Sequence, residues 1–136
     1  ECEKQIAAYC DKTFAVGVNS GSDALMLGMK ALGISAGDEV ITTSLSWVAT
    51  ANAIAALGAT PVFADVNDDL NLSVASVERL ITDKTKAILA VHYPGLIADM
   101  QHRFRACIGK RFKACAKPTR HNKYWVLVFR LMKSSM

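Results

Sequence analysis

Apolar and polar residues follow two different spacings along the first hundred positions of this chain, and the two spacings alternate. Short continuous apolar runs, typical of buried strands, occupy residues 14–18, 39–43, 61–66 and 86–91. Apolar residues recur every three to four positions, as on one face of a helix, in residues 1–11, 22–32, 47–57 and 73–81. After Met100 neither spacing persists, and only residues 124–129 resemble a strand.

The order of these segments, with strands and helices in alternation, predicts an α/β fold with a mainly parallel sheet that helices cover on both faces. Gly33 and Gly58 mark two predicted helix ends, and Ser73 is placed as the N-cap of the helix over residues 73–81. Ligands of such sheets bind where strands end and helices begin. The turns at residues 20–23 and 43–47 are therefore candidate binding positions.

The turn at residues 20–23 has the composition of an anion site, because an apolar run stops there and a helical pattern follows at once. Unpaired backbone N–H groups and the positive end of the helix dipole meet at such a start. Gly21 gives a ligand close access to the backbone, and Ser20 and Ser22 add hydroxyl groups. These features predict a phosphate site. The alternative is that Ser20 or Ser22 only caps the helix, since neither common glycine-rich nucleotide motif is present.

Charge divides the chain near residue 100. The net charge of +4 combines residues 1–100, which hold all twelve acidic residues, with residues 101–136, which hold ten of the sixteen Lys and Arg residues and no acid. A basic segment with interleaved aromatic residues is one pattern of nucleic-acid binding, and it is also typical of disorder. We expect a folded α/β part over residues 1–100 and a basic tail over residues 101–136.

Composition narrows the classes of function. Hydrophobic residues make up 51% of the chain, yet no uninterrupted apolar run reaches the roughly 18 residues that span a bilayer. The first residues include acids, whereas a signal peptide begins with positive charge. None of the four cysteines forms a C-x-x-C pair, which argues against a zinc ribbon or a redox motif. We expect a cytoplasmic protein without a metal site.

Four sequence blocks, taken together and in this order, resemble a known family. They read VNSGSDAL (18–25), GDEVITTSLSWVATANA (37–53), GATPVFADV (58–66) and TKAILAVHYPGLIADM (85–100). This combination is similar to the pyridoxal-phosphate-dependent sugar aminotransferases of the DegT/DnrJ/EryC1/StrS family, from about residue 5 to Met100. The resemblance implies that residues 1–100 are part of the large domain of the aspartate aminotransferase-like (type I) fold, a three-layer αβα arrangement.

The resemblance also implies roles for four residues in binding the cofactor. Gly21, Ser22 and Asp23 stand in the family's phosphate-binding turn, where Ser22 keeps a hydroxyl that threonine often supplies. Trp47 stands where the family has an aromatic residue that stacks on the pyridine ring, and a flat apolar surface there would orient the ring and exclude water. From the residues alone, the commoner role for Trp47 is a core anchor at a helix start.

No catalytic residue is assigned. His92 and Tyr93 follow a predicted strand and are interpreted as structural loop residues. Asp65 is also interpreted as structural, because the family's acid that pairs with the pyridine nitrogen belongs to a later block. In the family, that acid and the lysine that binds the cofactor covalently both lie beyond the equivalent of Met100. The lysines of residues 101–136 stand in no matching context, so none of them is assigned this role. We expect these 136 residues alone to be inactive.

Three accounts of the chain follow from the break near residue 100. The family continues with an acidic, helical segment, so a shifted reading frame or a truncated gene explains a basic continuation. A second account is a genuine basic arm that binds nucleic acid. The third is a non-enzymatic α/β module that binds a phosphorylated ligand at residues 20–23. Salt-dependent DNA binding would favour the arm.

The function that the resemblance implies is transfer of an amino group to a nucleotide-linked keto-sugar, with pyridoxal 5′-phosphate as cofactor and an amino acid, glutamate, as donor. The product would serve the synthesis of a polysaccharide, a lipid or an antibiotic. Family members are homodimers with shared active sites, and neither a membrane nor nucleic acid is the favoured partner. An incomplete sheet would leave apolar surface uncovered.

Overall fold

The computed structural model describes residues 1–10, 12–92, 112–114 and 126–131. Its elements in chain order are helices and strands with the following bounds: α1 (Cys2–Tyr9), α2 (Gly21–Ala31), β1 (Glu39–Thr43), α3 (Ala49–Ala55), β2 (Thr60–Ala64), α4 (Val74–Leu80), β3 (Thr85–Val91), β4 (Phe112–Ala114) and β5 (Val126–Leu131). The predicted alternation of helices and strands is confirmed from α2 to β3.

The five strands form a single mixed sheet in the order β2-β1-β3-β5-β4. Strand β1 lies between β2 and β3 and is parallel to both, with Ile41 opposite Val62 on one side and Ile88 on the other. Strand β5 pairs with the other edge of β3 in the antiparallel sense, and β4 pairs antiparallel with β5. The parallel part of the sheet therefore comes from the segment that the sequence pattern assigned to it.

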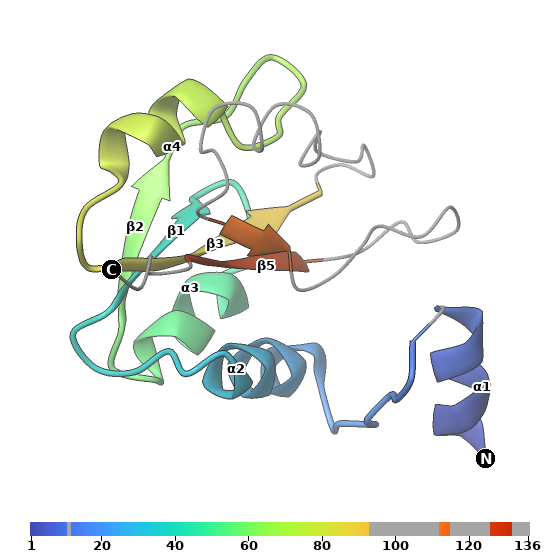
Figure 1. Ribbon diagram of the computed structural model, residues 1–136. Coiled ribbons are helices and arrows are strands. Elements are labelled where there is room, and N and C mark those ends of the chain that lie inside the picture. The colour runs from blue at the N-terminus through green and yellow to red at the C-terminus, as the bar shows by residue number, and fades with distance from the viewer. Residues whose placement is uncertain (11, 93–111, 115–125, 132–136) are drawn as a thin grey trace.

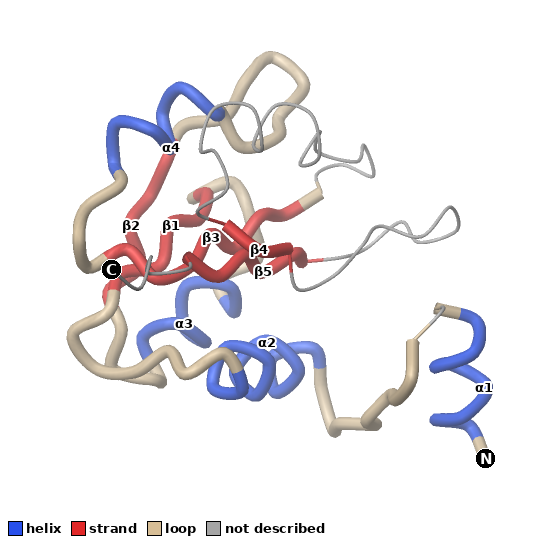
Figure 2. The backbone as a smooth tube through the Cα atoms, in the orientation of Figure 1, coloured by secondary structure: helices blue, strands red, loops and turns tan. Residues whose placement is uncertain are grey.

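Helices cover both faces of this sheet. Figure 1 shows α2 and α3 on one face and α4 on the opposite face, with the strands between them. The tube in Figure 2 shows the same three layers. The predicted three-layer αβα arrangement is confirmed. Helix α1 lies beyond the N-terminal end of α2, away from the strands.

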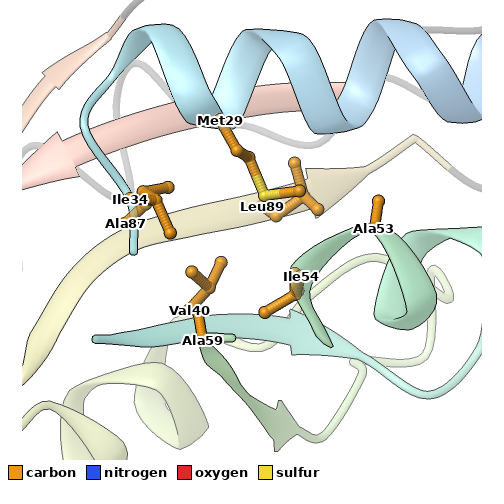
Figure 3. Packing of buried hydrophobic residues seen from close by; sticks show 8 residues of the cluster. All are labelled: Met29, Ile34, Val40, Ala53, Ile54, Ala59, Ala87 and Leu89. Atoms are coloured by element: carbon orange, nitrogen blue, oxygen red, sulfur yellow. The ribbon is translucent and has the colours of Figure 1, made fainter. Parts of the chain in front are cut away.

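Alternation along the strands divides the core into two clusters. The cluster between the sheet and the helices α2 and α3 consists of Met29, Ile34, Val40, Ala53, Ile54, Ala59, Ala87 and Leu89. Figure 3 shows Met29 reaching down from α2 onto Leu89 of β3. Val40 belongs to this cluster, and its neighbour Ile41 belongs to the other, because successive side chains of a strand point to opposite faces.

The second cluster lies under α4. It consists of Ile41, Ala64, Leu72, Val77, Ile88 and Ala90. The apolar residues predicted for the helical face of residues 73–81, Val74, Val77, Leu80 and Ile81, all pack in or against this cluster. The helical spacing therefore identified the correct face.

The predicted helix ends are confirmed in their geometry. Gly33 and Gly58 follow α2 and α3, both with φ of +74°, a left-handed conformation that glycine adopts without steric cost. The Oγ atom of Ser73 accepts a hydrogen bond from the N–H of Ser76 at 3.4 Å, so Ser73 is the N-cap of α4.

One predicted strand is wrong. Residues 14–18 form no strand, and the side chains of Phe14 and Val16 are 83% and 80% exposed. A strand needs a hydrogen-bonded neighbour, and the described strands leave none beside this segment. Its main-chain contact is instead with α1, where Glu3 Oε1 accepts from the N–H of Gly17 at 2.6 Å.

Strands β4 and β5 come from the segment that was expected to be a separate basic tail. Strand β5 covers most of the strand-like run predicted at residues 124–129 and adds to the edge of β3. The remainder of residues 101–136 lies outside the described residues. The division of the chain into residues 1–100 and residues 101–136 stays a prediction.

Candidate functional site

The start of α2 is capped by its own sequence. The Oγ atom of Ser20 accepts a hydrogen bond from the N–H of Asp23 at 3.1 Å and donates one to Asp23 Oδ2 at 2.9 Å. Ser20 has an extended backbone (φ −152°, ψ 163°), as an N-cap residue should. The capping role considered for Ser20 is confirmed. It is compatible with an anion site, because this cap satisfies one of the N–H groups of the first helical turn.

The cap leaves two N–H donors open at the helix start. Among the described residues, the N–H groups of Gly21 and Ser22 and the hydroxyl of Ser22 have no hydrogen-bond acceptor or donor opposite them. Both residues are exposed. A Cβ atom built on Gly21 would meet no heavy atom within 4 Å, so there is open space above the turn. Unpaired donors beside open space fit a phosphate group.

Trp47 lies in the turn between β1 and α3, and its side chain is 80% exposed. The alternative interpretation of Trp47 as a core anchor is therefore wrong. The predicted helix over residues 47–57 begins two residues later, at Ala49, because residues 44–46 bend and Trp47 precedes the first helical turn. The carbonyl oxygen of Trp47 accepts from the N–H of Thr50 at 3.0 Å.

Hydroxyl groups hold the turn that carries Trp47. Thr43 Oγ1 accepts from the N–H of Leu45 at 3.0 Å, and the hydroxyls of Ser46 and Thr50 lie 2.8 Å apart. Thr43 and Thr50 are both buried. Ser46 and Thr50 were not among the candidate residues predicted from the sequence. Their spacing of four residues beside a helix start is the signal that would have found them.

The two turns lie at the same edge of the sheet. In Figure 1 the strands β1 and β3 point toward the side on which both α2 and α3 begin, and α2 and α3 pack against each other. This edge is where parallel α/β sheets bind ligands. The structure thus brings the start of α2 and the turn before α3 to one side of the molecule, as the strand order predicts. The roles of Gly21, Ser22, Asp23 and Trp47 stay predictions.

Two other polar residues considered at strand ends, His92 and Asp65, are held by burial and by main-chain hydrogen bonds. His92 directly follows β3 and is 7% exposed, and this burial lowers its pKa below the usual value. Asp65 follows β2, where its N–H donates to Ser76 Oγ at 3.0 Å and its carbonyl accepts from the N–H of Ser73 at 2.8 Å. Tyr93 lies outside the described residues.

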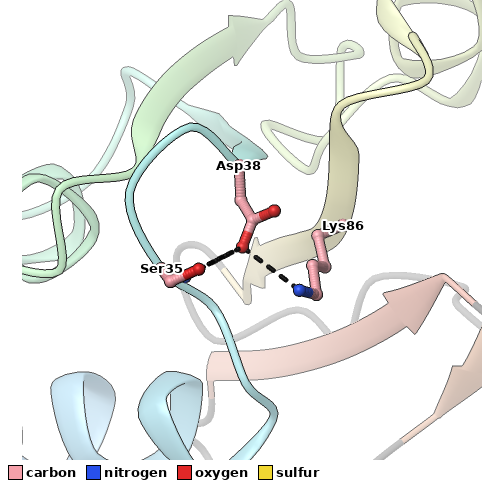
Figure 4. A network of polar contacts seen from close by, with 3 residues as sticks. All are labelled: Ser35, Asp38 and Lys86. Carbon is pink, nitrogen blue, oxygen red and sulfur yellow. Dashed lines mark hydrogen bonds and ion pairs between the residues drawn. The ribbon is translucent and has the colours of Figure 1, made fainter.

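The opposite edge of the sheet, where the strands begin, is closed by a polar network. Figure 4 shows Asp38, just before β1, between Ser35 and Lys86. Asp38 Oδ2 accepts from the N–H of Ser35 at 2.8 Å and lies 3.3 Å from Lys86 Nζ. Burial acts to raise the pKa of Asp38, but the hydrogen bonds from Ser35 and the Lys86 ammonium outweigh it, so the pKa lies below the usual value.

Comparison with known proteins gives a family for this arrangement. A family model described as the DegT/DnrJ/EryC1/StrS aminotransferase family matches residues 1–110. The chain belongs to this family. The match contains the whole stretch over which the four sequence blocks resemble the DegT/DnrJ/EryC1/StrS proteins, and it reaches ten residues beyond Met100.

Two curated relatives are named for nucleotide sugars. The chain is 49% identical over 102 residues to the GDP-perosamine synthase of Caulobacter vibrioides, covering 74% of this chain and 27% of that protein. It is 48% identical over 99 residues to the UDP-N-acetyl-3-dehydro-alpha-D-glucosamine 3-aminotransferase of Acidithiobacillus ferrooxidans, covering 72% and 27%. The chain thus spans about a quarter of the length of these relatives.

A solved structure extends the likeness to three dimensions. NtdA from Bacillus subtilis, crystallised with the bound cofactor PMP, is 40% identical with a TM-score of 0.73, over 76% of this chain and 24% of that one. This likeness confirms the predicted fold class, the first part of the large domain of the type I fold.

The non-enzymatic alternative finds no such support. Neither these comparisons nor the part of the chain that the structure describes favours a phosphate-binding module with a nucleic-acid-binding arm. Within the same described part, no helix is both long and apolar enough to cross a membrane.

Proposed function

We propose that this chain supplies the phosphate-binding and ring-binding part of a pyridoxal-phosphate-dependent aminotransferase that acts on nucleotide-linked keto-sugars. The observation that carries the proposal is the start of α2, where two N–H donors and a hydroxyl stand open beside empty space. The exposed indole ring of Trp47 belongs to the turn between β1 and α3, and this turn lies on the side of the molecule where α2 also begins. A phosphate group attached to a flat heterocycle needs these two features.

Each residue of the turn has a distinct part in this proposal. The N–H groups of Gly21 and Ser22 and the Ser22 hydroxyl donate to the cofactor phosphate, and the helix dipole favours its negative charge. The Asp23 carboxylate accepts from Ser20, which fixes the turn. The indole of Trp47 covers one face of the pyridine ring and excludes water from it. When bound, pyridoxal phosphate carries the amino group between donor and acceptor.

The identity of the substrates rests on the relatives. The names of both curated relatives include a nucleotide, GDP in one and UDP in the other. This supports a nucleotide-linked keto-sugar as the acceptor. We propose glutamate as the amino donor, a homodimer as the working assembly and the cytoplasm as its location, as the family resemblance implies. Residues 1–100 form the cofactor-binding part, with residues 101–136 outside it.

The proposal is tested by titrating the chain with PMP (pyridoxamine 5′-phosphate), which keeps the phosphate and the ring but has no aldehyde to react with surface lysines. A Trp125→Phe background leaves Trp47 as the single tryptophan, since the chain contains two. Quenching of its fluorescence then reports a ring that stacks on the indole. We expect saturable quenching that inorganic phosphate competes away.

Ser22→Ala is the variant that tests the phosphate turn. Its exposed hydroxyl has no partner among the described residues, so the folded state loses nothing, whereas a bond to a charged phosphate is lost. We expect PMP to bind about ten- to a hundredfold more weakly with an unchanged urea midpoint.

The matched control for Ser22→Ala is Thr60→Val. Thr60 is exposed and is the first residue of β2. It therefore lies where the parallel strands begin, away from the turns that precede α2 and α3, and its replacement should leave PMP affinity unchanged. Equal PMP affinity in the parent, Ser22→Ala and Thr60→Val, or no saturable quenching in any of the three, would overturn the proposed function.

A further inference from the structure

A buried threonine forms a hydrogen bond at each end of the segment that contains Trp47. Thr43, the last residue of β1, is 3% exposed, and its hydroxyl accepts from the N–H of Leu45. Thr50, in the first turn of α3, is 4% exposed, and its hydroxyl lies 2.8 Å from that of Ser46. The residues between these two anchors include Trp47, whose side chain is 80% exposed.

The hydroxyl pair of Ser46 and Thr50 is not a helix cap. The N-cap residue of α3 is Val48, and it makes no side-chain capping bond. A capping hydroxyl would accept from an N–H of the first helical turn. The Ser46 hydroxyl bonds instead to another hydroxyl, so the pair closes the turn across Trp47 and Val48.

An exposed indole needs such a closure if it is to bind a ring. With four-fifths of its surface in solvent, the Trp47 side chain has little packing around it, so the backbone of the turn determines where its Cα–Cβ bond points. Two bonds do so: the N–H of Thr50 donates to the Trp47 carbonyl at 3.0 Å, and the hydroxyl pair ties Ser46 to the same Thr50. A ring surface that is set in advance binds more tightly, because less freedom is lost on binding.

We propose that Ser46 and Thr50 are positioning residues that set the indole of Trp47 for stacking on the cofactor ring. This inference rests on the proposed function. Neither hydroxyl touches the cofactor; both act through the backbone on each side of Trp47. The pair therefore controls affinity for the ring, while the turn at Gly21 and Ser22 controls affinity for the phosphate.

The test uses the full 136-residue chain in the Trp125→Phe background. Thr50→Val removes the buried hydroxyl and keeps the shape of the side chain, Thr50→Ser restores the hydroxyl, and Ser46→Ala removes its partner. We expect Thr50→Val and Ser46→Ala each to weaken PMP binding roughly three- to tenfold and to reduce the quenching at saturation. Thr50→Ser should bind as the parent does, and Thr60→Val is the control.

A double variant tests whether the two hydroxyls act as a pair, and urea unfolding separates positioning from a loss of stability. If the two hydroxyls act as one pair, Ser46→Ala with Thr50→Val should bind PMP no more weakly than the worse of the two single variants. Urea unfolding is measured on every variant. Should Thr50→Val fail to fold, Ser46→Ala decides, since Ser46 is only half-buried.

The outcomes distinguish the inference from the function on which it rests. Weaker binding and reduced quenching in both single variants, with inorganic phosphate affinity unchanged, support the positioning pair. Parent-like PMP binding in a folded Ser46→Ala variant overturns the pair and leaves the proposed function standing. Absence of PMP binding by the parent itself overturns both.

Discussion

Two ionisable side chains of the described residues have pKa values that are displaced in the same direction for different reasons. His92 is buried behind β3, and burial disfavours its charged form. Asp38 is also partly buried, which acts to raise its pKa, but the bonds from Ser35 and Lys86 favour the charged carboxylate and outweigh that effect. The two groups therefore affect stability in separate ranges of pH.

His92 should make the fold less stable as pH falls below about 6.5, where an unfolded histidine gains its proton. In the folded chain the pKa is lower, so the unfolded state binds more protons in this range and the free energy of unfolding decreases. The contribution of Asp38 is lost only at lower pH, as pH falls through its own depressed pKa. Urea unfolding of the parent and of His92→Gln between pH 5 and pH 8 measures the difference. Parallel curves for the two proteins would contradict it.

Contacts that are local in sequence were the predictable part of the site. The cap formed by Ser20 and Asp23 spans three residues, so the pattern alone identified Ser20 as a candidate N-cap. The exposure of Trp47 was not predictable, because an indole at a helix start is more often buried. The Asp38–Lys86 ion pair joins residues 48 apart and depends on how β1 and β3 align, which no local pattern gives.

At the scale of elements, the two glycines that end α2 and α3 have the same backbone conformation and different neighbours. Gly33 has φ of +74° and open space where a Cβ would lie. Gly58 has the same φ, but a Cβ there would lie 3.0 Å from the Cβ of Ala36 and 3.3 Å from its Cα. Gly58 therefore carries a packing restraint in addition to a conformational one.

Substitution by alanine separates these two restraints. Gly33→Ala should lower the free energy of unfolding by about 1 kcal/mol through the left-handed backbone alone. Gly58→Ala should lower it by about 2–3 kcal/mol, because the new Cβ also pushes against Ala36. Urea unfolding of both variants gives the comparison, and an equal loss in the two would show that the contact at Ala36 relaxes freely.

Elements with a clear spacing of apolar residues were predicted well, and the wrong prediction of a strand at residues 14–18 has a physical cause. The helices α2 and α4 and the strands β1 to β3 were placed to within two residues of their bounds. Residues 14–18 have the composition of a strand, but an apolar run does not by itself supply the hydrogen-bonded neighbour that a strand requires. The order β2-β1-β3 and the antiparallel addition of β5 likewise depend on contacts between distant segments.

At the scale of the molecule, burial is concentrated in the two clusters on the faces of the sheet, while residues 14–18 lie outside both. Phe14→Ser should change the free energy of unfolding by no more than about 0.5 kcal/mol, because its side chain is already 83% exposed. The same change should lower the binding of a hydrophobic dye such as ANS.

Leu89→Ala is the counterpart of Phe14→Ser within the core. Leu89 is fully buried under Met29, so its truncation should cost about 2–5 kcal/mol. Urea unfolding with ANS fluorescence covers both variants. A large loss of stability for Phe14→Ser would mean that residues 14–18 are packed after all.

The two ends of the parallel strands are built for different demands. Ser35, Asp38 and Lys86 lock the end where the strands begin, and the opposite end presents an open helix start and a bare indole. Substitutions where the strands begin can therefore raise stability against heat or denaturant, while substitutions at the opposite end of the strands can change binding specificity.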